Sequence, residues 1–175
     1  MCSSDLVDGD MQLSAEAAFS GWYFQRPEEL HLPFTTEQIP TAVGPCPAWL
    51  FPGAETASDA ADTWAIQIHG RGANRSECLR AVPVFQGLGV TSLVVSYRND
   101  GDAPRTRNGS YSLGATEWRD VDAAIGWAIR HGARRIILMG WSMGGAIALQ
   151  VVVGSAHREL IGGLILDSPV VDWRT

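Results

Sequence analysis

Ser142 stands between an apolar run and a helix of small residues, an arrangement typical of a nucleophilic serine. Residues 136–139 (Ile-Ile-Leu-Met) are typical of a buried strand. Gly140 and Gly144 lie two residues before and after the serine, and they leave room for a strained turn that exposes its hydroxyl. Gly145 lets the new helix pack closely. We therefore expect Ser142 to attack an acyl carbon.

A tight structural turn is the alternative explanation for this pattern. Gly-x-Ser-x-Gly also arises by chance in a chain that is rich in glycine and serine. The strand before the serine, the helix after it and a second motif upstream favour the nucleophile. The helix would begin at the reaction centre, so the backbone N–H of Met143 would face an oxyanion.

The second motif is the run His69-Gly70-Arg71-Gly72, which directly follows the strand-like residues 64–68. Glycine on both sides of Arg71 frees the backbone to turn its N–H inward. With the N–H of Met143, this N–H would form a two-donor oxyanion hole. The alternative is that His69 caps a strand and Arg71 lies in an ordinary turn. As a base, His69 would lie on the oxyanion side of the serine, the wrong flank.

Length, composition and charge limit the classes of function. The chain has 175 residues, of which 46% are hydrophobic, enough for one domain with a substantial core. Its net charge of -6 argues against nucleic acid and anionic membranes as partners. Its four histidines never fall at the short spacings of a zinc site, so we expect no metal. No cofactor motif is present either, and we expect a small-molecule acyl substrate; the oligomeric state stays open.

Three cysteines, Cys2, Cys46 and Cys78, make an odd number without C-x-x-C spacing. This favours a reducing compartment over a disulfide framework, although a bridge between Cys46 and Cys78 stays open. We find no membrane-spanning run and no signal peptide in residues 1–20, which predicts a cytoplasmic protein. Residues 1–6 resemble a translated sequencing adapter, so we expect the first residues to be non-native.

Hydrophobic periodicity predicts an alternation of strands and helices after residue 62. We expect a short helix or packed arm over 14–25 and an antiparallel hairpin over 34–41 and 48–51 at a sheet edge, interrupted by turn signals at Gly44-Pro45-Cys46-Pro47. A surface loop over 54–62 follows. The remaining expected elements are strands 64–68, 92–97, 135–139 and 163–166, and helices 75–88 (kinked or split at Pro83), 116–131 and 143–155.

The helix predicted over 116–131 is amphipathic. Its apolar stripe comprises Trp118, Val121, Ala124, Ile125, Ala128 and Ile129. Its charged residues are expected mostly to face water: Glu117, Arg119, Asp120, Asp122 and Arg130. The long loop over 99–114 would either border the site or simply cross the surface, and the second interpretation is favoured.

This alternation predicts an α/β protein, a three-layer α/β/α arrangement with a mostly parallel sheet. Functional residues should then gather at the carboxyl ends of the strands. A dinucleotide-binding fold is not favoured, because the glycines after 136–139 do not form G-x-G-x-x-G and no P-loop lysine follows. Residues at the expected strand ends are His69-Gly70, Arg98-Asn99-Asp100, Ser142 and Asp167-Ser168.

With these motifs in this order, the chain resembles an α/β-hydrolase, and more narrowly the bacterial serine hydrolases of the prolyl-oligopeptidase-like and esterase-like branch. The resemblance covers about residues 30–173 and implies an eight-stranded sheet, Ser142 as nucleophile, and the N–H groups of Arg71 and Met143 as oxyanion donors. It rests on His-Gly-Arg-Gly (69–72), Ser-Tyr-Arg-Asn-Asp (96–100), Gly-Trp-Ser-Met-Gly-Gly (140–145) and Leu-Asp-Ser-Pro (166–169).

The family also requires an acid and a histidine after the serine. Only His157 follows Ser142, in a connection between elements, and we expect it to be a surface histidine. Asp167 follows the sixth strand, where some lipases of this fold carry their acid, but an acid without a histidine has no task. We favour Asp167 as a residue that holds the turn at Ser168-Pro169.

We therefore expect residues 1–29 to form an N-terminal arm and residues 30–175 an incomplete α/β-hydrolase domain. Strands one to six would be present, the last two strands missing, and the acid and histidine of the triad would lie beyond the end of this chain. The predicted function is a serine hydrolase acting on an ester or amide, with this chain alone nearly inactive. The alternative is an inactive fragment or a degenerate binding protein.

Overall fold

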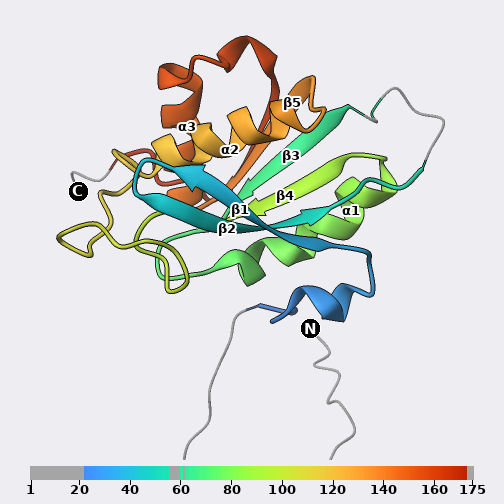
Figure 1. Cartoon of the computed structure of the whole chain (residues 1–175), viewed down its shortest axis with the longest axis horizontal. Coiled ribbons are helices and arrows are strands. Elements are labelled where there is room, and N and C mark those ends of the chain that lie inside the picture. Colours follow the sequence, from blue (N-terminus) through green and yellow to red (C-terminus); the bar gives the residue numbers. More distant parts are fainter. Residues whose placement is uncertain (1–21, 56–59, 61, 173–175) are drawn as a thin grey trace, which may run out of the picture.

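A six-stranded sheet forms the centre of the computed structural model, which describes residues 22–55, 60 and 62–172 (Figure 1). The first two neighbour pairs in the sheet are antiparallel and the other three are parallel. The predicted α/β class and the antiparallel hairpin at one edge are therefore confirmed. The strands, in their order across the sheet, are β1 (Thr35–Thr41), β2 (Gly44–Phe51), β4 (Thr91–Val95), β3 (Thr63–Ile68), β5 (Arg135–Trp141) and β6 (Ile161–Asp167).

The inner strands follow the predicted pattern of apolar, doubly covered parallel strands. All six residues of β3 are buried, and the four strands expected after residue 62 are all present within two residues of their predicted limits. Two longer helices, α2 (Trp118–Arg130) and α3 (Met143–Gly154), cover one face of the sheet (Figure 1). The opposite face carries η2 (Arg75–Ala81) and α1 (Val82–Gly87), so the three-layer arrangement is confirmed.

The segment expected as one helix over 75–88 is split close to Pro83, as its sequence indicated. The 3₁₀ helix η2 ends at Ala81, and α1 begins at Val82 with the proline in its first turn. Proline fits there because the first N–H groups of a helix have no intrahelical acceptor. Two further 3₁₀ turns are η1 (Pro27–Leu30) and η3 (Arg158–Leu160).

The turn expected at Gly44-Pro45-Cys46-Pro47 was wrong, because these residues belong to β2. The chain reverses at 42–43 instead, where the Thr41 hydroxyl accepts from the N–H of Val43 (3.3 Å) and donates to the carbonyl of Gly44 (2.6 Å). β2 pairs with β4 only over its last four residues, 48–51. The two prolines therefore lie where β2 has passed the end of the β4 ladder, a position that tolerates them.

The expectation that Glu117 and Asp120 face water was also wrong. Glu117 is fully buried and Asp120 is 3% exposed. The Glu117 carboxylate accepts from the N–H groups of Ser112 (2.6 Å) and Gly114 (2.9 Å), which belong to the preceding loop. Asp120 accepts from Arg98 Nε and Nη2, both at 2.7 Å. A buried charge is tolerated when it is paired, and these partners lie outside the helix that periodicity describes.

Cys46 and Cys78 are both buried and free, so no bridge joins them. Residues 14–21 of the helix or arm expected over 14–25, like residues 1–21 of the proposed arm 1–29, lie outside the described residues. Residues 22–25 are in neither helix nor strand. In the described part of the chain, no helix is long and apolar enough to span a membrane.

The buried pair of Arg98 and Asp120 generates a stability prediction. Asp120→Ala leaves the guanidinium of Arg98 buried without its acceptor, so we expect unfolding to become easier by about 3–5 kcal/mol. The matched control is Glu159→Ala, which removes the partner of an exposed contact with Arg158 and should cost less than about 1 kcal/mol. Urea denaturation measures both. Equal, small changes in the free energy of unfolding for the two variants would contradict a stabilising role of the buried pair.

The buried thiols generate a prediction of pH-dependent reactivity. Burial raises the pKa of Cys46 to about 11 and raises that of Cys78 as well. The thiolate is the reactive form, so both thiols should resist alkylation at pH 8 in the folded chain and react after unfolding. Iodoacetamide followed by peptide mass spectrometry measures each site. Native alkylation of either residue at the rate of the unfolded chain would show that the thiols are accessible.

Candidate active site

Ser142 occupies a sharp junction between β5 and α3. Its backbone has φ 51° and ψ −114°, a conformation that residues other than glycine rarely adopt. The turn is held by hydrogen bonds from the Ser142 N–H to the Asp167 carbonyl (2.9 Å) and from Val170 N–H to the Ser142 carbonyl (3.1 Å). The side chain is half-buried, and its Oγ makes no hydrogen bond within the described residues. Ser142 therefore presents a free hydroxyl from a fixed backbone.

The glycines around the serine are required by close backbone contacts. A Cβ at Gly140 would lie 2.4 Å from the carbonyl carbon of Gly144. A Cβ at Gly144 would lie 2.1 Å from the carbonyl oxygen of Ile68, and one at Gly145 would lie 2.7 Å from Pro169 Cβ. No side chain fits at these distances. The contact of Gly144 holds the start of α3 against the end of β3, and so brings Ser142 to the loop that follows β3.

That loop is the predicted motif 69–72, and it lies against the serine. A Cβ at Gly70 would be 3.2 Å from Ser142 Cβ. The Ala73 N–H approaches the Gly70 carbonyl at 3.4 Å, and Gly72 has φ 70°, which is typical of the third residue of a type II turn. Arg71 is exposed on this turn, whereas the Met143 side chain is fully buried. Within the described part of the chain, the backbone N–H groups of Arg71 and Met143 donate no hydrogen bond.

His69 is enclosed in a polar cluster and is not available as a base. Its ring is fully buried and stacks on Tyr97 with 4.4 Å between the ring centroids. Nδ1 lies 2.9 Å from the Gly70 carbonyl oxygen, and Nε2 lies 2.8 Å from Asp100 Oδ2. Both ring nitrogens are therefore occupied by partners other than Ser142.

The loop over 99–114 borders this cluster, so the favoured expectation that it simply crosses the surface was wrong. Its Tyr111 hydroxyl donates to Asp100 Oδ1 (2.8 Å), and burial raises the pKa of this tyrosine. At the other end of the loop, a Cβ at Gly114 would lie 3.4 Å from the Ile147 nitrogen in α3. Figure 1 shows the loop at the end of the sheet toward which β3 and β4 run.

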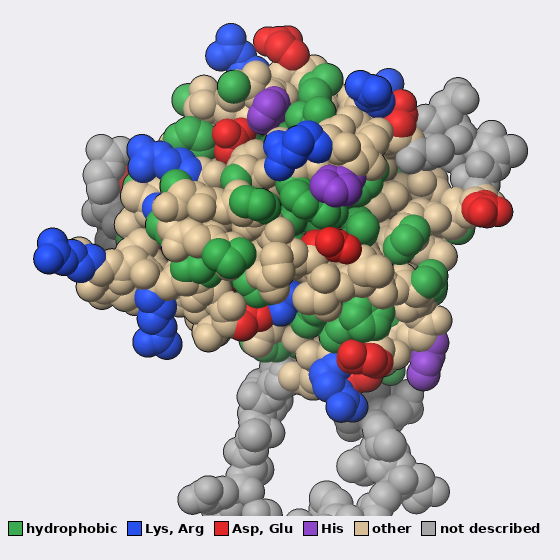
Figure 2. Space-filling view, in the orientation of Figure 1, with side chains coloured by type: hydrophobic (Ala, Val, Ile, Leu, Met, Phe, Trp, Pro, Cys, Tyr) green, Lys and Arg blue, Asp and Glu red, His purple; other side chains and the backbone are tan. Residues whose placement is uncertain are grey.

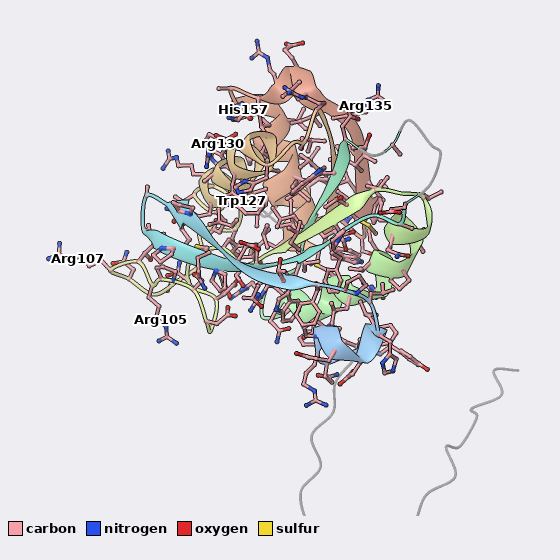
Figure 3. The ribbon with its side chains drawn as sticks, turned by 45° about the vertical axis from the view of Figure 1, so that its right-hand side comes forward. Arg105, Arg107, Trp127, Arg130, Arg135 and His157 are labelled. Carbon is pink, nitrogen blue, oxygen red and sulfur yellow. The ribbon has the colours of Figure 1, made fainter. Side chains whose placement is uncertain are left out.

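The two candidate partners after Ser142 lie in different places. Asp167 is half-exposed, accepts from the Ser168 hydroxyl (3.1 Å) and lies 3.6 Å from Arg80 Nη2. His157 follows the far end of α3, whose 12 residues span about 18 Å. Figure 3 shows it beside Arg130. The structure therefore does not bring His157 to Ser142.

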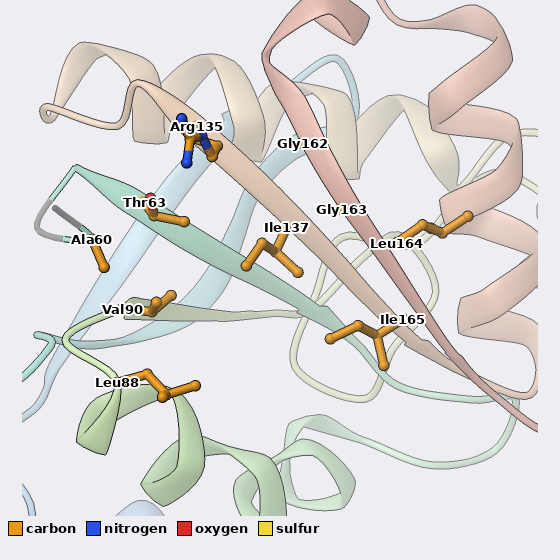
Figure 4. A pocket seen from close by; sticks show the side chains of 10 residues that line it. All are labelled: Ala60, Thr63, Leu88, Val90, Arg135, Ile137, Gly162, Gly163, Leu164 and Ile165. Carbon is orange, nitrogen blue, oxygen red and sulfur yellow. The ribbon is translucent and has the colours of Figure 1, made fainter. Parts of the chain in front are cut away.

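Two hollows lie on the sheet face that carries α1. One, of about 610 Å³, lies at the starts of β3 and β5, away from Ser142 (Figure 4). The other, of about 500 Å³, is lined by Met139, Phe85 and Trp141, with Arg80 and Asp167 at its charged side. Trp141 is 3% exposed and directly precedes the serine. The second hollow therefore reaches the residue next to Ser142.

Three residues of the cluster were not identified as site residues from the sequence. Glu77 accepts from the Gly70 N–H (2.6 Å), and the Tyr97 hydroxyl donates to the carbonyl of His69 (3.0 Å). Tyr111 completes the set through Asp100. Only Tyr97 carried a signal, because it is the last residue of the predicted strand 92–97; Glu77 and Tyr111 lie in segments whose patterns indicate no partner.

The described residues contain no group of three His, Cys, Asp or Glu side chains placed to hold a metal ion. On the face drawn in Figure 2, arginine side chains are interspersed with acidic and apolar ones and do not merge into one basic surface.

Comparisons with known proteins identify the family. The sequence profile described as "Alpha/beta hydrolase family" matches residues 68–175, which is more than half of the chain. The chain belongs to the alpha/beta hydrolase family. Among proteins with curated descriptions, none matches significantly.

Solved structures of other α/β hydrolases share the fold. An esterase from Pyrococcus furiosus aligns with a TM-score of 0.67 at 20% identity, over 89% of this chain and 58% of its own. A serine hydrolase without a lid from Xanthomonas campestris aligns with a TM-score of 0.62 at 22% identity, over 76% of this chain and 60% of its own. This α/β hydrolase chain thus spans less than two thirds of the length of these relatives.

The backbone contact of Gly144 generates a prediction for this α/β hydrolase chain. Gly144→Ala must separate α3 from β3 by about 1 Å, so we expect a loss of about 3 kcal/mol in unfolding free energy. Gly87→Ala is the matched control, because a Cβ at this helical glycine meets nothing within 4 Å. The control should be neutral or stabilising by up to about 1 kcal/mol. Similar urea midpoints for the two variants would contradict the close approach.

Proposed function

We propose that this chain carries the nucleophile and the oxyanion donors of a serine hydrolase that cleaves an ester or amide of a small-molecule acyl substrate. The observation that carries the proposal is the strained backbone of Ser142, which holds a free hydroxyl beside the Gly70 loop. Backbone strain of this kind is common at functional positions. The names of the structural relatives, an esterase and a serine hydrolase, support the same chemistry.

In the proposed reaction, Ser142 Oγ attacks the acyl carbon while a general base takes its proton. The carbonyl oxygen becomes an oxyanion that accepts from the N–H groups of Arg71 and Met143. Collapse of this intermediate breaks the ester or amide bond, and the protonated leaving group departs as an alcohol or amine. Water then hydrolyses the acyl-enzyme and regenerates the serine.

The base is the part of the machinery that the described residues do not supply. His69 is occupied on both ring nitrogens, and His157 lies about the length of α3 from the serine. All four histidines of the sequence lie among the described residues, so we propose that the histidine and the acid of the triad are not supplied by these 175 residues, with Asp167 as a less favoured acid. A neutral serine alone is a weak nucleophile, so the 175-residue chain should react slowly.

A non-catalytic binding protein is the second candidate function. It is favoured by one observation, that no histidine in the described residues is hydrogen-bonded to Ser142. The two candidates differ in whether the Ser142 hydroxyl forms a covalent bond with an acyl or phosphonyl centre.

A fluorophosphonate probe tests the nucleophile. We expect slow labelling of the folded chain at Ser142, confirmed by peptide mass mapping, because free oxyanion donors still accelerate the attack when the base is missing. Ser142→Ala should reduce labelling to the level of the unfolded chain. Ser168→Ala, which alters another serine at the same end of the sheet, should label like the parent chain. Labelling that survives Ser142→Ala, or that never exceeds the unfolded chain, would favour the binding protein.

A further inference from the structure

The peptide between Gly70 and Arg71 is held by its carbonyl group. The Gly70 carbonyl oxygen lies 2.9 Å from His69 Nδ1 and 3.2 Å from the Tyr97 hydroxyl. The described residues contain no cis peptide bond, so the Arg71 N–H points away from this carbonyl across the same plane. The groups that hold the Gly70 carbonyl therefore set the direction of the Arg71 N–H.

Glu77 holds the same loop from the preceding peptide. Its Oε2 accepts from the Gly70 N–H at 2.6 Å, and it would lie 3.3 Å from a Cβ at Gly70. Because Gly70 is bound at both its N–H and its carbonyl, it cannot rotate without breaking one of these bonds. The position of the loop beside Ser142 is thus fixed by side chains from η2 and from the end of β4.

The orientation of the His69 ring depends on Asp100. Nε2 lies 2.8 Å from Asp100 Oδ2, and the carboxylate is 2% exposed. Asp100 is itself bound by the Tyr97 N–H (2.9 Å) and by the Tyr111 hydroxyl (2.8 Å). The carboxylate on Nε2 fixes the rotation of the ring, and with it the position of Nδ1 at 2.9 Å from the Gly70 carbonyl oxygen.

We propose that Asp100 is a positioning residue of the reaction: acting through His69, it fixes the Gly70–Arg71 peptide and aims the Arg71 N–H at the oxyanion. The proposal rests on the proposed function of Ser142 and adds a residue that never touches the substrate. Asp100 does this from the first turn after β4, so the loop after one strand controls the loop after its neighbour in the sheet.

A carboxylate suits this position because it accepts from three donors at once. An ionised Asp offers two oxygens with about four acceptor directions, and here it meets a ring nitrogen, a phenol and a backbone N–H. An Asn could keep its one oxygen for His69 and the Tyr97 N–H, but its amide N–H would face the Tyr111 hydroxyl, which could then no longer donate there. The nearby Asp102 provides a contrast, because it is half-exposed and binds Arg75 and Ser96 instead of His69.

The test compares Asp100→Ala, Asp100→Asn and the control Asp102→Asn in the full 175-residue chain. The saturation kinetics of fluorophosphonate labelling separate the maximal rate from the probe concentration at half-saturation. We expect Asp100→Ala to lower the maximal rate about tenfold to a hundredfold with little change in half-saturation, since a misaimed donor affects only the attack. Asp100→Asn should lie in between, and Asp102→Asn should match the parent chain.

Amide NMR supplies a readout without any probe. In ¹⁵N-labelled chain, the Arg71 amide and the His69 ring N–H resonances should shift in Asp100→Ala, shift less in Asp100→Asn and stay in place in Asp102→Asn. Unchanged Arg71 and His69 resonances in a folded Asp100→Asn chain would overturn the proposal. So would a maximal labelling rate of Asp100→Ala equal to that of the parent chain, provided that the parent chain labels at Ser142. Shifted resonances in a chain without Ser142-dependent labelling would instead contradict the proposed function, while the link from Asp100 to Arg71 would stand.

Discussion

The site depends on a direct backbone contact between the start of α3 and the end of β3. Gly144 approaches the Ile68 carbonyl so closely that a single added carbon would lie 2.1 Å from its oxygen. This contact sets the height of α3 on the sheet and therefore the place of Ser142 at its first turn. Because β3 and β5 are parallel neighbours, the same contact brings the loop after β3 to the serine. The strained backbone of Ser142 is tolerated because β6 and α3 hold it on both sides.

Around this contact, buried charges organise the loops at the carboxyl ends of the strands. Asp100 binds His69 and Tyr111, Asp120 binds Arg98, and Glu117 binds the backbone of the loop before α2. Each carboxylate is almost fully buried and satisfied by several donors. Such networks are costly when one member is lost, so they fix a single arrangement more firmly than apolar packing would. The loops that border Ser142 are thus held by several buried hydrogen bonds.

The sequence predicts those parts of this structure that depend on local pattern. Apolar runs identify the parallel strands, the helical stripe identifies α2, and glycine spacing identifies the turn at Ser142, because each signal arises within a few residues. Glu117 and Asp120 were misplaced because their partners lie outside the helix, and Gly44–Pro47 because pairing across the sheet overrides local turn preference. The motif at 69–72 was recognised, but the residues that hold it, Glu77 and Tyr97, depend on contacts that no spacing shows.

We propose that the Gly70–Arg71 peptide and the first turn of α3 form one oxyanion site beside Ser142. The most direct measurement is a crystal structure of the chain after covalent reaction with a phosphonate at Ser142. This arrangement predicts a phosphonyl oxygen within about 2.7–3.1 Å of both the Arg71 and the Met143 nitrogens. An oxygen that points to solvent or to another donor, with the Arg71 N–H unengaged, would contradict it.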